Sequence, residues 1–382
     1  MAKRYLHIEV NVHQRPKRLG QVCGDVVSVT RSDTVTMVVV CDGVGSGVPA
    51  HVAARMCQSR LERLLSEGFS PRETFLCVAA SMEQWKQPGK PYAAFTVVQI
   101  RSDGAAAVLS YESPQAIWIT GQQAMVLPQR LIQVNGICIH ESTCYLGTGE
   151  SLLLMTDGIT QSGLEVMPDG WQSKGVAEYL TGLLSKKQMV NPAQQIQSKA
   201  AAINRDIDYD DATAVWMQCR PGRALSLWTG PPAEKLMDMA MVEQFMAMPG
   251  TKVICGATTA AIAARTLGRQ VQIEPEPTSL IAPPKYFIEG VDLVTEGAVT
   301  LNQLNNVLEL QPDDFHEISA VTELYDLVTA ADRIHILLGT GKNPANNDAC
   351  FVQRGVLSRE KIIPLIAQKL RQQGKCVVIE TI

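Results

Sequence analysis

The chain has 382 residues, 46% of them hydrophobic, and its 34 basic and 38 acidic residues give a formal net charge of -4 at pH 7. This balance excludes a broad electrostatic attraction to nucleic acid or anionic lipid, so we expect neither a nucleic acid nor a membrane as partner. No apolar run has the length of a signal peptide or of a membrane span. We therefore expect a cytoplasmic protein. We also expect two domains, because a single hydrophobic core seldom supports a chain of this length.

Short apolar segments separated by turns predict antiparallel strands in the first half of the chain. These segments are residues 35–41, 93–100, 105–111, 116–119 and 152–155. Residues 49–65 and 71–84 show helical periodicity, and each begins with a proline, which the first turn of a helix tolerates. Helices on antiparallel sheets predict an α+β layered domain over residues 1–222.

The pattern changes after residues 219–223, which are followed by Gly-Pro-Pro at 230–232. Beyond them, segments typical of strands alternate with helical segments. The expected strands are residues 252–255, 333–338 and 376–380, and the expected helices are residues 317–331 and 358–373. This alternation favours a smaller α/β domain with some parallel pairing over residues 230–382.

Aspartates recur at the polar ends of the apolar segments in the first domain. Their contexts are Gly24-Asp25, Asp42-Gly-Val-Gly-Ser-Gly47, Thr156-Asp157-Gly158 and Asp210-Asp211-Ala-Thr-Ala-Val215. A single Asp-Gly is a common turn, but several strand ends can aim carboxylates at one point, and a following glycine allows close approach. Hard divalent cations prefer such oxygen ligands, and a pair of them activates water against a phosphoryl group. The sequence therefore predicts metal-assisted phosphate hydrolysis.

At these residues the sequence resembles the metal-dependent protein phosphatase (PPM, type 2C) family, and within it the branch typified by stage II sporulation protein E. The segments 42–47, 156–158 and 210–215 are similar to that branch's D-G-x-G-x-G, S-D-G and D-D-x-T-x-V elements, and Gly24-Asp25 stands at its first Gly-Asp. The resemblance covers about residues 18–220. It implies two antiparallel sheets flanked by helices, and a phosphatase that acts on phosphoserine or phosphothreonine of a partner protein.

The resemblance also implies a role for each of these residues. Asp42 would bridge two Mn²⁺ or Mg²⁺ ions, with the Gly43 carbonyl on one of them, and Asp157 and Asp210 would complete the second site. Asp25 would hold metal-bound water or act as a ligand itself, and Asp211 would lie beside the ligands. The family allows a third ion, its nucleophile is a bridging hydroxide, and the catalytic set would be Asp42, Asp157 and Asp210.

The sequence departs from the eukaryotic pattern at two points. Val44 stands where those enzymes have a histidine proposed as general acid, and their phosphate-clamping arginine has no secure counterpart. Arg15, Lys17 and Arg18 lie shortly before Asp25 and are candidates for the clamp.

Other candidates are set aside in favour of the metal site. His51 is interpreted as a surface or capping residue. Ser46 does not have the register of a nucleophile elbow, and the scattered cysteines, Cys41 among them, are interpreted as reduced structural thiols.

The second domain carries its own signals. Residues 253–259 and 290–297 resemble the tail of phosphatases associated with iron-only hydrogenase gene clusters, which implies a link to anaerobic redox metabolism. The step from a strand through Gly256-Ala-Thr-Thr259 into an alanine-rich helix predicts a seat for a small anionic or phosphorylated ligand, with residues 339–341 at the same sheet edge.

Two alternatives to the protein phosphatase remain open. One is a catalytically silent phosphatase-like module that binds or senses a phosphoprotein, and the other is a small-molecule phosphatase. The complete set of aspartates favours an enzyme over the silent module, since such modules are expected to lose ligands.

Overall fold

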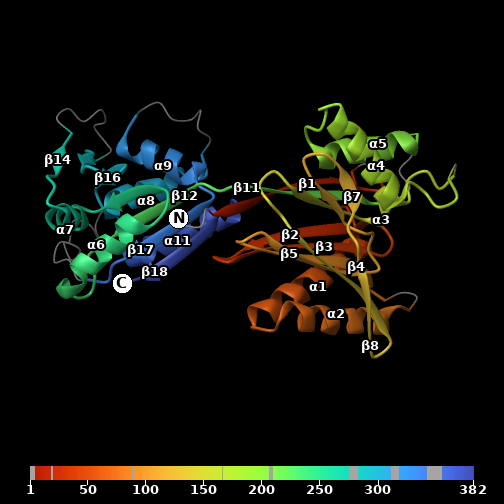
Figure 1. The fold of residues 1–382 in the computed structure, drawn as a ribbon. Helices are drawn as coiled ribbons and strands as arrows, with labels where there is room; N and C mark the ends of the chain where they lie inside the picture. Colours follow the sequence, from red (N-terminus) through yellow and green to blue (C-terminus); the bar gives the residue numbers. More distant parts are fainter. Residues whose placement is uncertain are drawn as a thin grey trace. The chain divides into compact units, whose positions relative to one another are not determined.

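The computed structural model describes residues 5–18, 20–87, 90–165, 167–205, 210–274, 283–310, 318–341 and 355–382. The chain divides into two compact units (Figure 1). The sandwich unit holds residues 6–30 and 34–221, and the C-terminal unit holds the chain from 222 onward together with Tyr5 and residues 31–33. Among the described helices, none is both long and apolar enough to cross a membrane.

Two antiparallel sheets form the centre of the sandwich unit. The first has the strand order β1 (Leu6–Arg15), β11 (Ala212–Pro221), β10 (Ser151–Met155), β6 (Ile117–Ile119) and β7 (Ala124–Val126). The second has the order β2 (Asp25–Arg31), β3 (Val35–Gly43), β4 (Ala93–Arg101), β5 (Ala105–Tyr111), β9 (Ile137–Tyr145) and β8 (Arg130–Val134). Their facing sides share one core, which includes Val38, Leu152 and Val215.

Helices cover the outer face of each sheet (Figure 1). Helices α1 (Gly47–Ser66) and α2 (Pro71–Trp85) pack on the second sheet through a core that includes Leu61, Phe75 and Phe95. Helices α4 (Gln172–Ser185) and α5 (Pro192–Ile203) pack on the first sheet, and the short α3 (Asp157–Thr160) follows β10. The predicted helix, sheet, sheet, helix sandwich is therefore confirmed.

Local sequence explains where several of these elements begin. Helix α2 starts with Pro71 and has a capping box, in which the Ser70 hydroxyl accepts from the Glu73 amide and the Glu73 carboxylate accepts from the Ser70 amide. Strand β10 is apolar and buried along its length because it lies between β11 and β6 in the middle of its sheet. Strand β1 is absent from the sequence prediction, although Leu6, Ile8 and Val10 alternate with polar residues over a strand-like period of two.

The described residues of the C-terminal unit form an α/β layer around a sheet of seven strands. Its order is β14 (Gln272–Ile273), β15 (Tyr286–Phe287), β16 (Leu293–Thr295), β13 (Thr251–Cys255), β12 (Ala224–Thr229), β17 (Arg333–Leu338) and β18 (Cys376–Thr381). The five strands from β16 to β18 are parallel, and β14 and β15 join antiparallel at one edge. Strand β12, which precedes residue 230, is the middle one of the five parallel strands.

Helices lie on both faces of this sheet. Helices α6 (Asp238–Ala247) and α7 (Ala257–Leu267) bury one face around Trp228 and Phe245, and a short 3₁₀ turn, η1 (Lys235–Met237), precedes them. Helices α8 (Ala298–Val307), α9 (Ala320–Ala330) and α11 (Arg359–Gln372) bury the other face around Leu324 and Ile363. The predicted α/β character is confirmed, with more parallel pairing than the sequence indicates.

Candidate functional site

Strand ends bring the predicted aspartates to one end of the sandwich. Strand β2 begins at Asp25, and β3, its neighbour in the second sheet, ends one residue after Asp42. In the first sheet, β10 ends shortly before Asp157, and the antiparallel β11 begins directly after Asp211. The negative charges of Asp25, Asp157 and Asp210 each raise the pKa of Asp42, so carboxylates from both sheets lie within electrostatic reach of one another.

Asp25 is the most deeply buried of these carboxylates, with 2% of its surface exposed. The hydroxyls of Thr156 and Thr213 donate to its Oδ2 at 2.9 and 2.6 Å, whereas its Oδ1 has no hydrogen-bond partner. Burial raises its pKa to about 7, against the lowering effect of the two hydroxyls. No role was predicted for the two threonines, although they lie inside the T-D-G and D-D-A-T motifs.

Asp42 and Asp157 lie close enough to share a hydrogen bond. Loss of hydration is the main reason that the pKa of Asp42 lies well above its usual value, and the charge of Asp25 and the contact with Asp157 raise it further. The glycines after these two aspartates are sterically required. A Cβ on Gly43 would stand 1.9 Å from the Ala50 carbonyl oxygen, and one on Gly158 would stand 2.2 Å from the Asp211 carbonyl oxygen.

Asp210 and Asp211 are neighbours with different surroundings. The Lys17 amide donates to Asp211 Oδ1 at 2.8 Å, and Lys17 Nζ lies 3.7 Å from Asp210 Oδ1. Burial raises the pKa of Asp210, while its hydrogen bond from the Asp211 amide and the charge of Lys17 lower it. Of the proposed clamp residues, Lys17 contacts the aspartates, Arg15 lines a cavity of about 20 Å³ with Asp210, and Arg18 is exposed.

The candidates that were set aside have structural surroundings. His51 Nδ1 lies 2.9 Å from the Cys23 carbonyl oxygen, which ties α1 to the loop before Asp25. Cys41 is fully buried, and burial together with a contact to Cys57 raises the pKa of its thiol well above the usual value, so it is a poor nucleophile. The nine described cysteines form no disulfide, and Cys350 lies outside the described residues.

The chemistry of this cluster fits a hard divalent cation. Asp25 Oδ1 and Asp211 Oδ2 are buried acceptors without a partner, and the Asp42 and Asp157 carboxyls repel each other unless a proton or a cation lies with them. Within the described ranges, no three His, Cys, Asp or Glu side chains enclose a position for a metal ion as they stand. The donor set is thus suitable, while the assignment of individual ligands remains a prediction.

Comparison with protein families matches residues 32–220 to the model described as "Stage II sporulation protein E (SpoIIE)". Residues 32–220 form a SpoIIE-family domain. The SpoIIE domain contains Asp42, Asp157 and Asp210, whereas Asp25 and strand β1 precede the matched segment. No curated protein sequence matches the chain.

Solved structures similar to this chain include several phosphatase domains. The phosphatase domain of the cell fate determinant SpoIIE from Bacillus subtilis is 19% identical and covers 57% of this chain and 94% of its own, with a TM-score of 0.45. The SiaA-PP2C domain of Pseudomonas aeruginosa is 14% identical and covers 55% and 85%, with a TM-score of 0.44. Because both scores are below 0.5, the family assignment rests on the matched SpoIIE model.

Proposed function

We propose that the SpoIIE domain is a metal-dependent protein serine/threonine phosphatase. The observation that carries this proposal is the cluster of mutually repelling carboxylates around Asp42. Lys17, beside Asp210, offsets part of their negative charge. Asp42, Asp157, Asp210 and the Gly43 carbonyl would hold two Mn²⁺ or Mg²⁺ ions, and Asp25 would hold a water or an ion beside them. When bound, such ions polarise a phosphate ester and activate water for its hydrolysis.

Other groups of the chain would position the carboxylates and the substrate. Thr156 and Thr213 fix the Asp25 side chain through its Oδ2, which leaves Oδ1 free to accept from water or bind a cation. Lys17 is the best-placed basic residue for a phosphate, since its side chain is about one-third exposed beside Asp210. With Val44 in place of a histidine, protonation of the leaving group would come from water or be less important.

A groove beside the Asp42 loop favours a protein substrate over a small metabolite. It has a volume of about 720 Å³ and is lined by Val44, Val48 and Val52 together with the basic residues Lys86 and Lys90. Val44 and Val48 are each 62% exposed. Exposed apolar side chains of this kind suit an extended peptide segment, because a metabolite phosphate has little apolar surface to bury. The resemblance of residues 253–259 and 290–297 to hydrogenase-associated phosphatases implies a link to anaerobic redox metabolism and names no substrate.

Turnover of p-nitrophenyl phosphate by the full-length chain tests the enzyme proposal. We expect hydrolysis with Mn²⁺, none after chelation with EDTA, and less than about a tenth of wild-type turnover in Asp42→Asn and Asp157→Asn. The matched control is Asp169→Asn, an exposed aspartate of the same unit. Binding of phosphoprotein without any Mn²⁺-dependent release of phosphate would instead support the silent binding module.

A second measurement separates protein from metabolite substrates. Val48→Asp places a negative charge in the apolar groove, so we expect it to raise KM for phosphopeptides at least about fivefold more than KM for p-nitrophenyl phosphate. An equal change in both values, together with better turnover of metabolite phosphates than of phosphopeptides, would favour the small-molecule phosphatase.

A further inference from the structure

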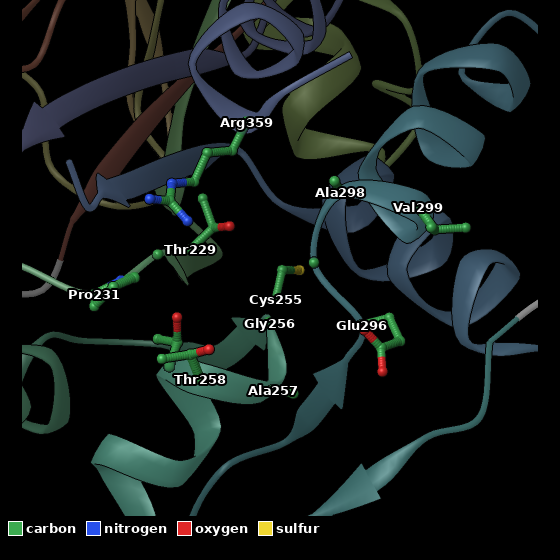
Figure 2. Close-up of a pocket in the computed structure, with 13 residues that line it drawn as sticks. Thr229, Pro231, Cys255, Gly256, Ala257, Thr258, Glu296, Ala298, Val299 and Arg359 are labelled. Atoms are coloured by element: carbon green, nitrogen blue, oxygen red, sulfur yellow. The ribbon is translucent and has the colours of Figure 1, made fainter. Parts of the chain in front are cut away.

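The parallel strands of the C-terminal unit end at a cavity of about 330 Å³. It is lined at the carboxyl ends of three neighbouring strands by Thr229, the last residue of β12, by Cys255, the last residue of β13, and by Glu296, directly after β16 (Figure 2). The parallel strands follow the order third, second, first, fourth, fifth along the chain. In sheets with this order, ligands bind outside the carboxyl ends of the strands, near the point where the order reverses.

Two helices begin at this cavity without a side-chain cap. Helix α7 has 11 residues and starts after Gly256, and α8 has 10 residues and starts after Gly297. Neither first turn is capped by a side chain, so amide N–H groups and the positive ends of both helix dipoles remain available to an acceptor. Gly256 has a φ of 132°, and a Cβ on Gly297 would stand 3.4 Å from the Gly256 Cα, so glycine allows the two loops to approach.

Thr259 supplies a separate indication that a ligand binds here. This residue lines the cavity and is 1% exposed, and its Oγ1 has no hydrogen-bond partner. The hydroxyl faces the loop at the start of α7, because a Cβ on Gly256 would stand 3.4 Å from that oxygen. A buried hydroxyl without a partner is destabilising, and a ligand acceptor in the cavity would remove this cost.

The cavity has a basic side, at Arg359, and an acidic side, at Glu296. Arg359 is 8% exposed, and its guanidinium donates from Nε to the Gly339 carbonyl at 2.9 Å and from a second nitrogen to the Gly341 carbonyl. Figure 2 shows Arg359 and Thr258 on one side of the end of β13 and Glu296 on the other. Glu296 accepts a hydrogen bond from the Tyr286 hydroxyl at 2.6 Å through Oε1. The first side suits an anion, and the carboxylate suits hydroxyl donors.

We propose that this cavity binds a phosphate ester with a hydroxyl-bearing body, such as a nucleoside monophosphate or a sugar phosphate. The phosphate would accept from the first-turn amides of α7 and from the Thr259 hydroxyl, near the positive charge of Arg359. The sugar hydroxyls would donate to Glu296. The volume of about 330 Å³ lies at the small end of the range for ligand sites, which favours a mononucleotide or smaller over a dinucleotide. This binding does not depend on the proposed phosphatase activity.

Isothermal titration calorimetry on the full-length chain tests the proposal. EDTA is present throughout, so that phosphate cannot bind through metal ions at the aspartate cluster. The probes are AMP, ribose 5-phosphate, inorganic phosphate and adenosine. We expect at least one of the two esters to bind with a Kd below about 1 mM, and at least about tenfold more tightly than inorganic phosphate or adenosine. Absence of ester binding, or equal binding of AMP and adenosine, overturns the proposal.

Thr259→Val and a matched control variant locate the binding site. Thr259→Val removes the unpartnered hydroxyl with little change in shape, and we expect it to weaken ester binding about tenfold. Thr300→Val is the matched control, because Thr300 is equally buried in the first turn of α8, its Oγ1 is also unpartnered, and it does not line the cavity. Equal losses in both variants would place the ester elsewhere.

Glu296→Gln provides an independent check at a less buried position. We expect it to weaken ester binding and to leave the affinity for inorganic phosphate unchanged. Only the ester carries sugar hydroxyls that can donate hydrogen bonds to Glu296. Circular dichroism would check that each variant is folded. If Thr259→Val does not fold, unchanged ester binding by Glu296→Gln is sufficient to reject the proposed orientation, and the comparison of esters with adenosine still tests the site.

Discussion

Replacement of Asp25 by asparagine should stabilise the metal-free protein at neutral and alkaline pH. Asp25 is buried with one carboxylate oxygen unpartnered, and burial raises its pKa from 3.8 to about 7. The folded protein therefore binds a proton at Asp25 more tightly than the unfolded chain does. The wild type loses stability as pH rises from about 4 to about 7, because the unfolded state releases this proton first. Asparagine carries no charge in either state and does not lose stability in this way.

The size of the effect follows from the shift in pKa. A change from 3.8 to about 7 corresponds to about 4 kcal/mol, since each pH unit is worth about 1.4 kcal/mol. The oxygen of the asparagine side chain can still accept hydrogen bonds from Thr156 and Thr213. Its nitrogen would then take the buried position of Oδ1, away from solvent. We therefore expect a gain that approaches about 4 kcal/mol above pH 7 and disappears below about pH 4.

Urea unfolding in EDTA, followed by tryptophan fluorescence, measures this gain. Trp85, Trp118, Trp171 and Trp216 lie in the sandwich unit, so the signal reports mainly on the unit that contains Asp25. The free energies of unfolding are compared between pH 5 and pH 8, with Asp169→Asn as the exposed control. A difference between Asp25→Asn and wild type that is the same at both pH values would refute the reasoning, because it would show that Asp25 has no raised pKa in the folded protein.

Three further predictions concern the same unit. Mn²⁺ at about 100 times its Kd should raise the unfolding free energy of the wild type by about 2.7 kcal/mol, and Asp42→Asn should lose most of that gain in thermal-shift measurements. Gly43→Ala should cost about 1–3 kcal/mol in urea unfolding because its Cβ meets the Ala50 carbonyl, whereas Gly121→Ala, in open space, should be nearly neutral. Iodoacetamide should modify exposed Cys77 and Cys138 without loss of turnover, and acid-quenched reactions should contain no phosphoenzyme, whose detection would point to a nucleophilic side chain.

The sequence determined the elements whose cause is local. Pro71 and the helical periodicity of residues 71–84 predict α2, and the apolar run before Asp157 predicts β10, because first-turn preferences and periodicity act within a few residues. The ordered aspartate motifs likewise predicted that the aspartates lie at strand ends, as they do in the structure. Their resemblance to the SpoIIE branch predicted a SpoIIE-type domain, and the family match confirmed that domain. Their individual roles as metal ligands remain predictions.

Only the tertiary structure decided what surrounds these side chains. Asp25 meets Thr156 and Thr213, which are more than 130 residues away in the chain, because the two sheets bring the ends of β2, β10 and β11 together. The order of the parallel strands places Thr259 beside the loops after β12 and β16, and α11 adds Arg359 to the same cavity. Strand order depends on packing between distant segments, and local periodicity does not encode it. The sequence therefore predicted a ligand seat at the start of α7, whereas the cavity there, the second helix that begins at it and its acidic side are visible only in the fold.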